Sequence, residues 1–133
     1  MRKILLFAFT LLFFAVFASC GDTRPTFSIN HLAIYDANNP AYPLSSPLVV
    51  HKGSPFVFKV VFYNAKNEAM DVAKPENIIW SMSPVSTQPW LASSEYTATL
   101  IVPATYSGST GGVSMQVEYG TLPPVSLTFE IQD

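Results

Sequence analysis

Apolar and polar residues alternate along most of the chain after residue 26, which is typical of strands with one face on a core and one in water. The clearest runs are VSMQVEY at residues 113–119 and VSLTFEIQ at residues 125–132, where every second residue is apolar. Five further short segments carry strand patterns, at residues 27–36, 47–52, 55–64, 77–82 and 95–102. Because clusters of Pro, Gly, Ser and Asn separate these runs, the sequence predicts about seven short strands.

The patterns of two of these segments support more detailed predictions. The run PFVFKVVFYN at residues 55–64 is apolar on one face and carries Val57, Lys59, Val61 and Tyr63 on the other. This pattern predicts a central strand whose outer face is partly covered. In the segment 27–36 the apolar phase slips between Ile29 and Leu32, which predicts a β-bulge or a strand that changes sheets.

The connecting segments differ in what they allow. Residues 37–47 contain three prolines, so this segment can cross between sheets or cover an edge but cannot form a central strand. Residues 64–77 contain helix formers interrupted by Pro75 and several asparagines, which predicts a loop with room for one helical turn.

About seven short strands with almost no helix indicate an all-β fold, a β-sandwich. Trp80, in the segment NIIWSM, suits the core position that strand C of such a sandwich commonly gives to a tryptophan. Cys20 is the single cysteine of the chain, so the sandwich has no internal disulfide and apolar packing alone must hold its sheets together.

Three stretches resemble bacterial immunoglobulin-like domains: GSPFVFKVVFYNAKNEAM at residues 53–70, NIIWSMSP at 77–84 and SEYTATLIVPATYSG at 94–108. The resemblance covers residues 27–133, and it implies one immunoglobulin-like sandwich domain. It also implies an extracytoplasmic module used as a spacer, an adhesive domain or a binding platform. It carries no catalytic residue to this chain, so we expect a protein that is not an enzyme.

The N-terminus has the pattern of a secretory signal peptide. Arg2 and Lys3 precede the apolar run of residues 4–18, which is broken only by Thr10. As a helix this run would be roughly 22 Å long, shorter than the roughly 30 Å hydrocarbon core of a bilayer. A cleaved signal is therefore favoured over an uncleaved membrane anchor, which is the alternative.

Ala18-Ser19-Cys20 resembles a bacterial lipobox, although Phe17 stands where leucine is usual. The resemblance implies a lipoprotein signal peptide at residues 1–19 and a lipid, such as palmitate, on Cys20, with residues 20–26 as a short tether. A membrane partner through this anchor is expected. Gly21 rather than aspartate follows the cysteine, which favours the outer membrane of a two-membrane cell envelope and leaves the surface and periplasmic faces both open.

The amino-acid composition limits which kinds of partner the chain can bind. Arg2 and Lys3 would leave with the signal peptide, so the mature part has five basic and nine acidic residues and a net charge of −4. Such a chain lacks the basic footprint of a nucleic-acid-binding protein. Few charges and many aromatic and β-branched residues predict an ordered domain.

The chemical motifs of enzymes and metal sites are missing, so neither a cofactor nor a metal is expected. His31 and His51 fall on predicted strands, and Asp36 with its neighbouring asparagines fits a polar turn better than a calcium loop. Glu118 and Glu130 lie on the polar faces of two predicted strands, where a solvated surface is the simpler interpretation. A sandwich-fold hydrolase would need these groups in a deep pocket.

Loop aromatics are the remaining candidates for a binding surface. Tyr42, Trp90 and Tyr106 lie in predicted loops where the strand pattern does not require them, and tyrosine and tryptophan are enriched at binding hot spots. The alternative is that each ring packs over an end of the sandwich. The sequence thus predicts a non-catalytic module for binding, adhesion or assembly with an envelope or surface protein, and a purely structural spacer is the alternative.

Overall fold

Ten strands and two short 3₁₀ helices make up the regular structure of the described residues, 28–108 and 111–133, in the computed structural model. The predicted signal peptide, the predicted tether with Cys20, and Phe27 lie outside these residues. Among the described residues, no helix has the length and apolarity needed to cross a membrane. The elements are β1 (Ile29–Asp36), β2 (Asn39–Pro43), β3 (Leu48–His51), β4 (Pro55–Asn64), β5 (Ala69–Met70), η1 (Pro75–Asn77), β6 (Ile79–Ser83), η2 (Val85–Trp90), β7 (Leu91–Ser94), β8 (Thr97–Ile101), β9 (Ser114–Glu118) and β10 (Val125–Gln132).

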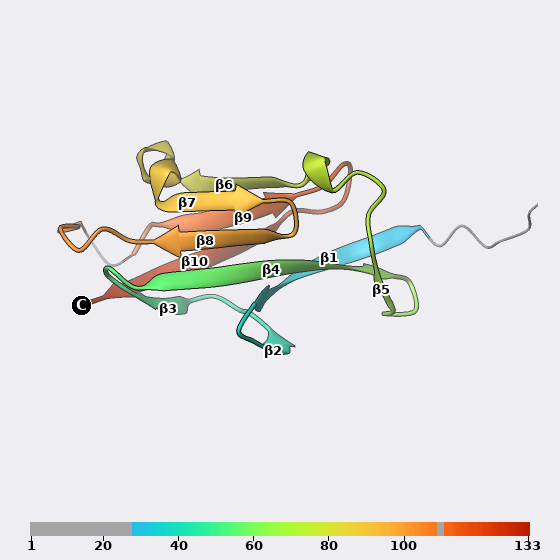
Figure 1. Cartoon of the computed structure of the whole chain (residues 1–133), viewed down its shortest axis with the longest axis horizontal. Helices are drawn as coiled ribbons and strands as arrows, with labels where there is room; N and C mark the ends of the chain where they lie inside the picture. The colour runs from blue at the N-terminus through green and yellow to red at the C-terminus, as the bar shows by residue number, and fades with distance from the viewer. Residues whose placement is uncertain (1–27, 109–110) are drawn as a thin grey trace, which may run out of the picture.

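The strands form two sheets that pack as a sandwich (Figure 1). The larger sheet has the order β2-β1-β4-β8-β7, with β5 added beside β4, and the smaller sheet has the order β3-β10-β9-β6. Strands β1, β4, β8 and β7 thus occupy the places of strands A, B, E and D of an immunoglobulin domain, and β6, β9 and β10 those of C, F and G. The chain is an immunoglobulin-like β-sandwich, as the sequence predicts.

All seven predicted strands are present, and three further strands lie in segments that the sequence assigns to loops. Strand β2 is at the edge of the larger sheet. An edge strand tolerates Pro40 and Pro43, because its solvent-facing side has no neighbouring strand to which a backbone N–H would donate. Strand β5 has only two residues, and β7 reads Leu-Ala-Ser-Ser, so neither has a recognisable alternation. The helical turn allowed in residues 64–77 is η1.

The predicted phase slip is a bulge within one sheet. The pairing of β1 with β4 shifts register between Ile29 and His31, which returns Leu32 and Ile34 to the core face. The change of sheet comes later along the chain, after β2. The proline-rich segment crosses to the smaller sheet, where β3 pairs in parallel with β10.

The core lies between the inward faces of β4 and the strands opposite it. Phe58, Val60 and Phe62 of β4 are fully buried, and the ring centroid of Phe58 lies 6.0 Å from that of Phe129 on β10. Strand β4 pairs with β1 on one side and β8 on the other, so it is the central strand that the sequence predicts. Packing of this kind supplies the inter-sheet contact that a disulfide provides in antibody domains.

Trp80 lies in this core on β6, the strand in the C position, with 6% of its surface exposed. Its indole Nε1–H donates to the backbone oxygen of Glu95, 2.8 Å away, so the single polar atom of the ring is satisfied. Because Glu95 lies in the turn between β7 and β8, the tryptophan connects the smaller sheet to the larger one.

Replacing Trp80 with alanine should lower the free energy of unfolding by about 3–5 kcal/mol, because it leaves a large cavity and an unpaired carbonyl. Equilibrium unfolding in denaturant measures this change. Ile79→Ala is the matched control, since Ile79 is the preceding residue of β6 and 57% of it is exposed. That variant should lose less than about 1 kcal/mol. Equal unfolding midpoints for the two variants would show that Trp80 is not a core residue.

Candidate functional site

Trp90 and Tyr106 form a plug at one end of the sandwich. Trp90 ends η2 and Tyr106 lies in the turn after β8, and their rings meet edge to face with centroids 4.8 Å apart. Both rings are half-buried against the hydrophobic core. A Cβ added at Gly108 would overlap the Tyr106 ring, which explains the glycine there. These two residues follow the packing alternative rather than a free binding surface.

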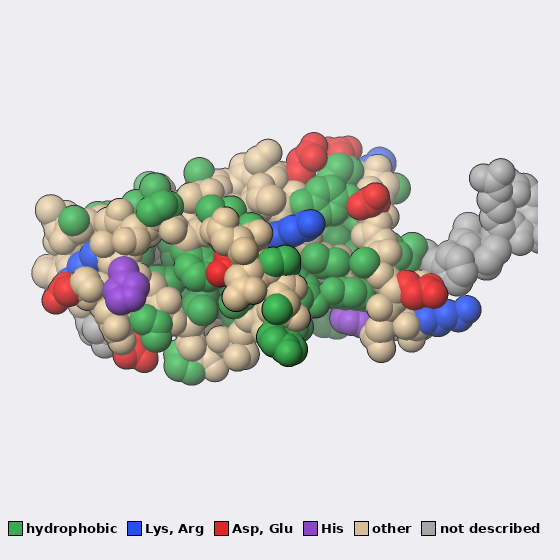
Figure 2. All heavy atoms as spheres, turned by 60° about the horizontal axis from the view of Figure 1, so that its bottom comes forward, with side chains coloured by type: hydrophobic (Ala, Val, Ile, Leu, Met, Phe, Trp, Pro, Cys, Tyr) green, Lys and Arg blue, Asp and Glu red, His purple; other side chains and the backbone are tan. Residues whose placement is uncertain are grey.

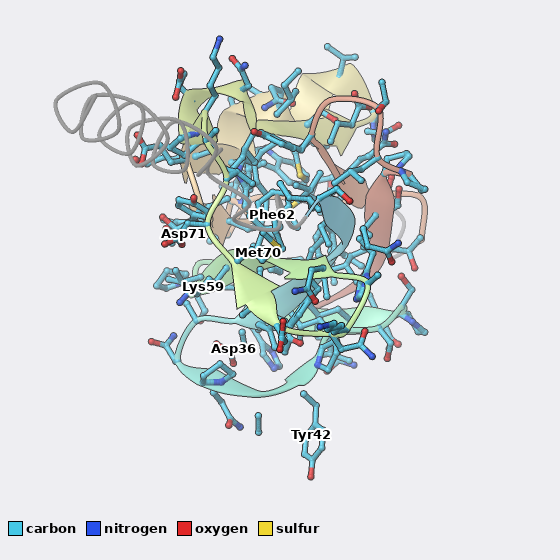
Figure 3. The ribbon with its side chains drawn as sticks, turned by 90° about the vertical axis from the view of Figure 1, so that its right-hand side faces the viewer. Asp36, Tyr42, Lys59, Phe62, Met70 and Asp71 are labelled. Carbon is cyan, nitrogen blue, oxygen red and sulfur yellow. The ribbon has the colours of Figure 1, made fainter. Side chains whose placement is uncertain are left out.

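Tyr42 is separate from this plug, so the three loop aromatics do not form one surface. It lies on β2, at the edge of the larger sheet opposite to β7, and it is 81% exposed. Figure 3 shows its side chain pointing away from the body of the domain. A hollow of about 400 Å³ lies between β2 and the crossover to β3, with Asp36 and Leu48 among its lining residues.

The acidic residues considered for hydrolysis lie far apart. Strands β9 and β10 are neighbours, but the register pairs Val117 with Val125, which places Glu118 and Glu130 near opposite ends of the pair. Six residues of strand separate their rows, which is roughly 20 Å and well beyond the spacing of a carboxylate pair in glycosidases. Each glutamate instead accepts a hydrogen bond from a glutamine side chain of its own strand, Gln116 or Gln132.

The histidines and Asp36 make local contacts. His31 Nδ1 lies 3.1 Å from Asn30 Oδ1, and His51 Nδ1 lies 3.1 Å from the backbone oxygen of Asp133. Asp36 Oδ1 accepts the Asn38 backbone N–H at 2.8 Å, which is the polar turn that the sequence favours over a calcium loop. No group of three or more His, Cys, Asp or Glu side chains able to hold a metal occurs among the described residues.

A second hollow in the larger sheet arises from a gap between strands. On the side away from β1, the long strand β4 pairs with β8 along Pro55–Lys59 and with β5 at Phe62 and Tyr63. Between these pairings, Val60 and Val61 have no strand partner on that side, and a hollow of about 330 Å³ opens there. We call it the gap hollow; its lining residues are Lys59, Val60, Val61, Ala69, Met70, Asp71 and Tyr96.

Asn64 fixes one wall of the gap hollow. Its side chain is buried, with 3% of the residue exposed, and its Oδ1 accepts the backbone N–H groups of Lys66 and Glu68 at 2.9 and 3.0 Å. Its Nδ2 donates to Glu68 Oε2 at 2.7 Å. Asn67, at the turn, has a φ of +61°, a conformation that asparagine tolerates better than most residues. This hairpin brings Ala69 and Met70 back beside β4.

Tyr96 forms the opposite wall. Its backbone oxygen accepts the Val60 N–H at 2.8 Å, and its phenolic oxygen accepts the Val72 N–H at 3.0 Å. Its ring packs edge to face on Phe62 with centroids 6.2 Å apart. The phenolic O–H has no acceptor among the described residues, so it can still donate to a bound molecule.

Lys59 and Asp71 are the two charged residues of the gap hollow. Both are exposed, and neither forms an ion pair or a hydrogen bond through its side chain with any described residue. In Figure 3 they lie on the same side of the domain, with Met70 further inward. The gap hollow therefore presents an unpaired ammonium and an unpaired carboxylate beside an apolar surface.

An aromatic row lies beside the gap hollow on the outer face of the same sheet. The His31 and Tyr63 rings stack with centroids 5.1 Å apart, and the phenolic oxygens of Tyr35 and Tyr63 are 2.6 Å apart. Register places Tyr35 opposite Lys59 across the β1–β4 pair, and Tyr63 opposite Ala69 of the gap hollow. Figure 2, which turns the β2 side towards the viewer, shows apolar side chains along the middle of this surface and most charged ones nearer its two ends.

The pKa of Tyr35, one member of the tyrosine pair, is raised. Partial burial, together with the hydrogen bond to Tyr63 and the charge that Tyr63 would carry, raises the pKa of Tyr35 to about 12. Tyr35 therefore stays protonated at neutral pH, and one of the two hydroxyl groups donates to the other.

Sequence reasoning missed the gap hollow because β5 is too short to detect. The alternation of residues 55–64 does place Lys59, Val61 and Tyr63 on one outer face, and the structure confirms that placement. Strand β5, which pairs with this part of β4, has no recognisable pattern in the sequence.

Of the comparisons with known proteins, only the one with solved structures finds matches. No protein-family model matches the chain, and no curated protein matches it. Among solved structures, domains 4 and 5 of the S-layer protein SbsC align with a TM-score of 0.44 and 18% sequence identity, covering 80% of this chain. The chain spans about half the length of that structure, 53%.

The Trp90–Tyr106 pair should be energetically coupled. In a double-mutant cycle of Trp90→Ala and Tyr106→Ala, an edge-to-face pair should give a coupling of about 0.5–1.5 kcal/mol in the free energy of unfolding. Trp90→Ala combined with Tyr42→Ala is the control, and those two changes should add to within about 0.5 kcal/mol. Additive effects for Trp90 and Tyr106 would contradict the plug.

Stability should fall at high pH through Tyr35. An unfolded tyrosine titrates near pH 10, whereas the folded state holds the Tyr35 proton up to about pH 12. The contribution of Tyr35 to stability is therefore complete below about pH 10 and is lost as the pH rises towards about 12. NMR of ring-labelled tyrosine measures the titration, and Tyr63→Phe should lower the Tyr35 midpoint by removing the hydrogen bond. Tyr42→Phe should not change it, and an unchanged Tyr35 midpoint in Tyr63→Phe would refute the coupling.

Proposed function

We propose that this chain is a lipid-anchored module of the bacterial cell envelope that binds a partner or ligand, without catalysis, through the outer face of its larger sheet. The observation that carries the binding part is the gap hollow. Lys59 and Asp71 stand unpaired at its apolar surface, and Tyr96 has a hydroxyl proton to donate. A few polar groups converging on an apolar concavity are the usual composition of a binding site.

The anchoring part rests on the N-terminal sequence. A basic start, an apolar run and Ala18-Ser19-Cys20 support cleavage before the cysteine and lipid attachment to its thiol. Two or three acyl chains give stable anchoring, because each buried methylene contributes about 0.8 kcal/mol. Gly21 after the cysteine supports the outer membrane as the destination.

The fold determines which end of the domain such an anchor would hold. Strand β1 starts at Ile29, which pairs with Asn64 at the β4–β5 hairpin. Residues 20–28 reach at most about 30 Å when fully extended. A lipid on Cys20 would therefore keep the hairpin end of the sandwich towards the membrane, and the Trp90–Tyr106 plug would face away from it. In Figure 1 the hairpin end and the C-terminus lie at opposite ends of the domain.

The same geometry supports binding over a spacer role. A spacer requires only a stable sandwich, and the outer face of the larger sheet could then be uniformly polar. Instead that face combines an aromatic row of His31, Tyr35 and Tyr63 with the gap hollow. Aromatic side chains with a polar tip are typical of contact surfaces, because one part of the side chain is apolar and the other hydrogen-bonds.

Replacing Cys20 with alanine should release the protein from the membrane fraction, because the lipid attachment site is removed. Cell fractionation followed by immunoblotting measures the release, and incorporation of labelled palmitate should disappear with it. Phe17→Leu is the matched control, since it restores the usual lipobox residue and should stay anchored and labelled. Full membrane retention of the Cys20→Ala variant would refute the anchor.

A photo-activatable crosslinker at Val61, on the outer face, distinguishes binding from a spacer role in intact cells. A product that is lost in the Lys59→Gln, Asp71→Asn double variant supports binding at this face. No product, with the same label at the plug residue Trp90 also silent, supports the spacer.

A further inference from the structure

We infer that the gap hollow takes a small zwitterion, a molecule with a carboxylate and an ammonium group on an apolar body, such as a short unblocked peptide. This inference rests on the proposed function and names the ligand class of the same site. It follows from which groups line the gap hollow and from which of them have partners within the domain.

The charge pattern of the gap hollow complements a zwitterion. The Lys59 ammonium can bind a ligand carboxylate, and the Asp71 carboxylate can bind a ligand ammonium, as charge-assisted hydrogen bonds. The two residues form no ion pair with each other although they line one hollow, so each charge is available to a ligand. A ligand with a single charge could pair with only one of these two residues, and the other would remain without a partner.

The uncharged lining fits the body of such a ligand. Val61, Ala69 and Met70 give an apolar surface, and the free O–H of Tyr96 offers one donor to a carbonyl or carboxylate oxygen. A volume of about 330 Å³ is at the lower end of ligand pockets in general and suits a small molecule rather than a long segment. Methionine is also the most adaptable apolar residue for contacting side chains of different shapes.

The walls of the gap hollow are held independently of its charged groups. Asn64 orders the β4–β5 hairpin through its side-chain hydrogen bonds, and Tyr96 bonds both Val60 and Val72. Lys59 and Asp71 take no part in these bonds. Their charges can therefore be removed without dismantling the gap hollow, so the inference can be tested with variants that keep the fold.

The NMR signals of the methionine methyl groups can measure binding at the gap hollow. Met70 lines the gap hollow, while Met82 and Met115 are buried in the core. In the lipidated protein in detergent micelles, with labelled methionine methyls, titration with the dipeptide alanyl-leucine should shift the NMR signal of Met70 and leave those of Met82 and Met115 in place. The two core signals also report that each variant is folded.

Capped dipeptides and charge variants test each contact separately. N-acetyl-alanyl-leucine lacks the ammonium and alanyl-leucine amide lacks the carboxylate, and each should bind about fivefold more weakly, the ratio expected for a solvent-exposed ion pair of about 1 kcal/mol. Asp71→Asn should remove the penalty of the acetyl cap, and Lys59→Gln should remove that of the amide. Lys74→Gln and Glu76→Gln, exposed charge changes outside the gap hollow, should change nothing.

Two outcomes overturn the inference. If all three dipeptides shift Met70 equally, the gap hollow binds apolar groups without reading charge. If none shifts Met70, the ligand is not a zwitterion of this kind. Neither result bears on the anchor, which the fractionation of the Cys20→Ala variant decides, nor on binding at this face, which the crosslinker at Val61 decides.

Discussion

The contact between the two sheets along strand β4 is the constraint on which the rest of this structure depends. The single cysteine cannot form an internal bridge, so the removal of apolar surface from water is the main interaction that holds the sheets together. Phe58, Val60 and Phe62 are completely buried on one face of β4, and Phe129 meets them from β10. Each such side chain contributes roughly 1.5–3 kcal/mol, so this contact is a large part of a typical domain's net stability.

The length of β4 also creates the candidate site. Strand β4 has ten residues, but β8 pairs with only its first half and β5 only near its end. The gap between these partners leaves Val61 partly exposed, while Val60 stays buried. The site is therefore a consequence of two short strands sharing one long neighbour. It is built on a strand whose inward face is buried in the core.

The sequence was sufficient where packing alone determined the structure. Alternation found all seven main strands, the slip at Ile29 found the bulge, and the isolated Trp80 was correctly assigned to the core. Strands β2, β5 and β7 were missed because two prolines, a length of two residues and a Leu-Ala-Ser-Ser composition leave no periodic signal. The gap hollow was missed with β5. Tyr106 lies in a loop as the sequence predicts, whereas Trp90 ends the 3₁₀ helix η2, and only the structure could show that their rings contact each other.

Two charged side chains at the C-terminal end of the domain are paired with each other, whereas those at the gap hollow pair with none of the described residues. At the end that carries the C-terminus, Lys52 Nζ lies 2.5 Å from Asp133 Oδ1, and that hydrogen bond lowers the pKa of the Asp133 carboxyl. The pair joins the end of the chain to the residue after β3. Lys59 and Asp71, further along the sheet, have no such partner among the described residues, and the gap hollow does not need them for its shape. Since exposed charges add little to stability even when paired, the stability of the fold does not depend on Lys59 and Asp71.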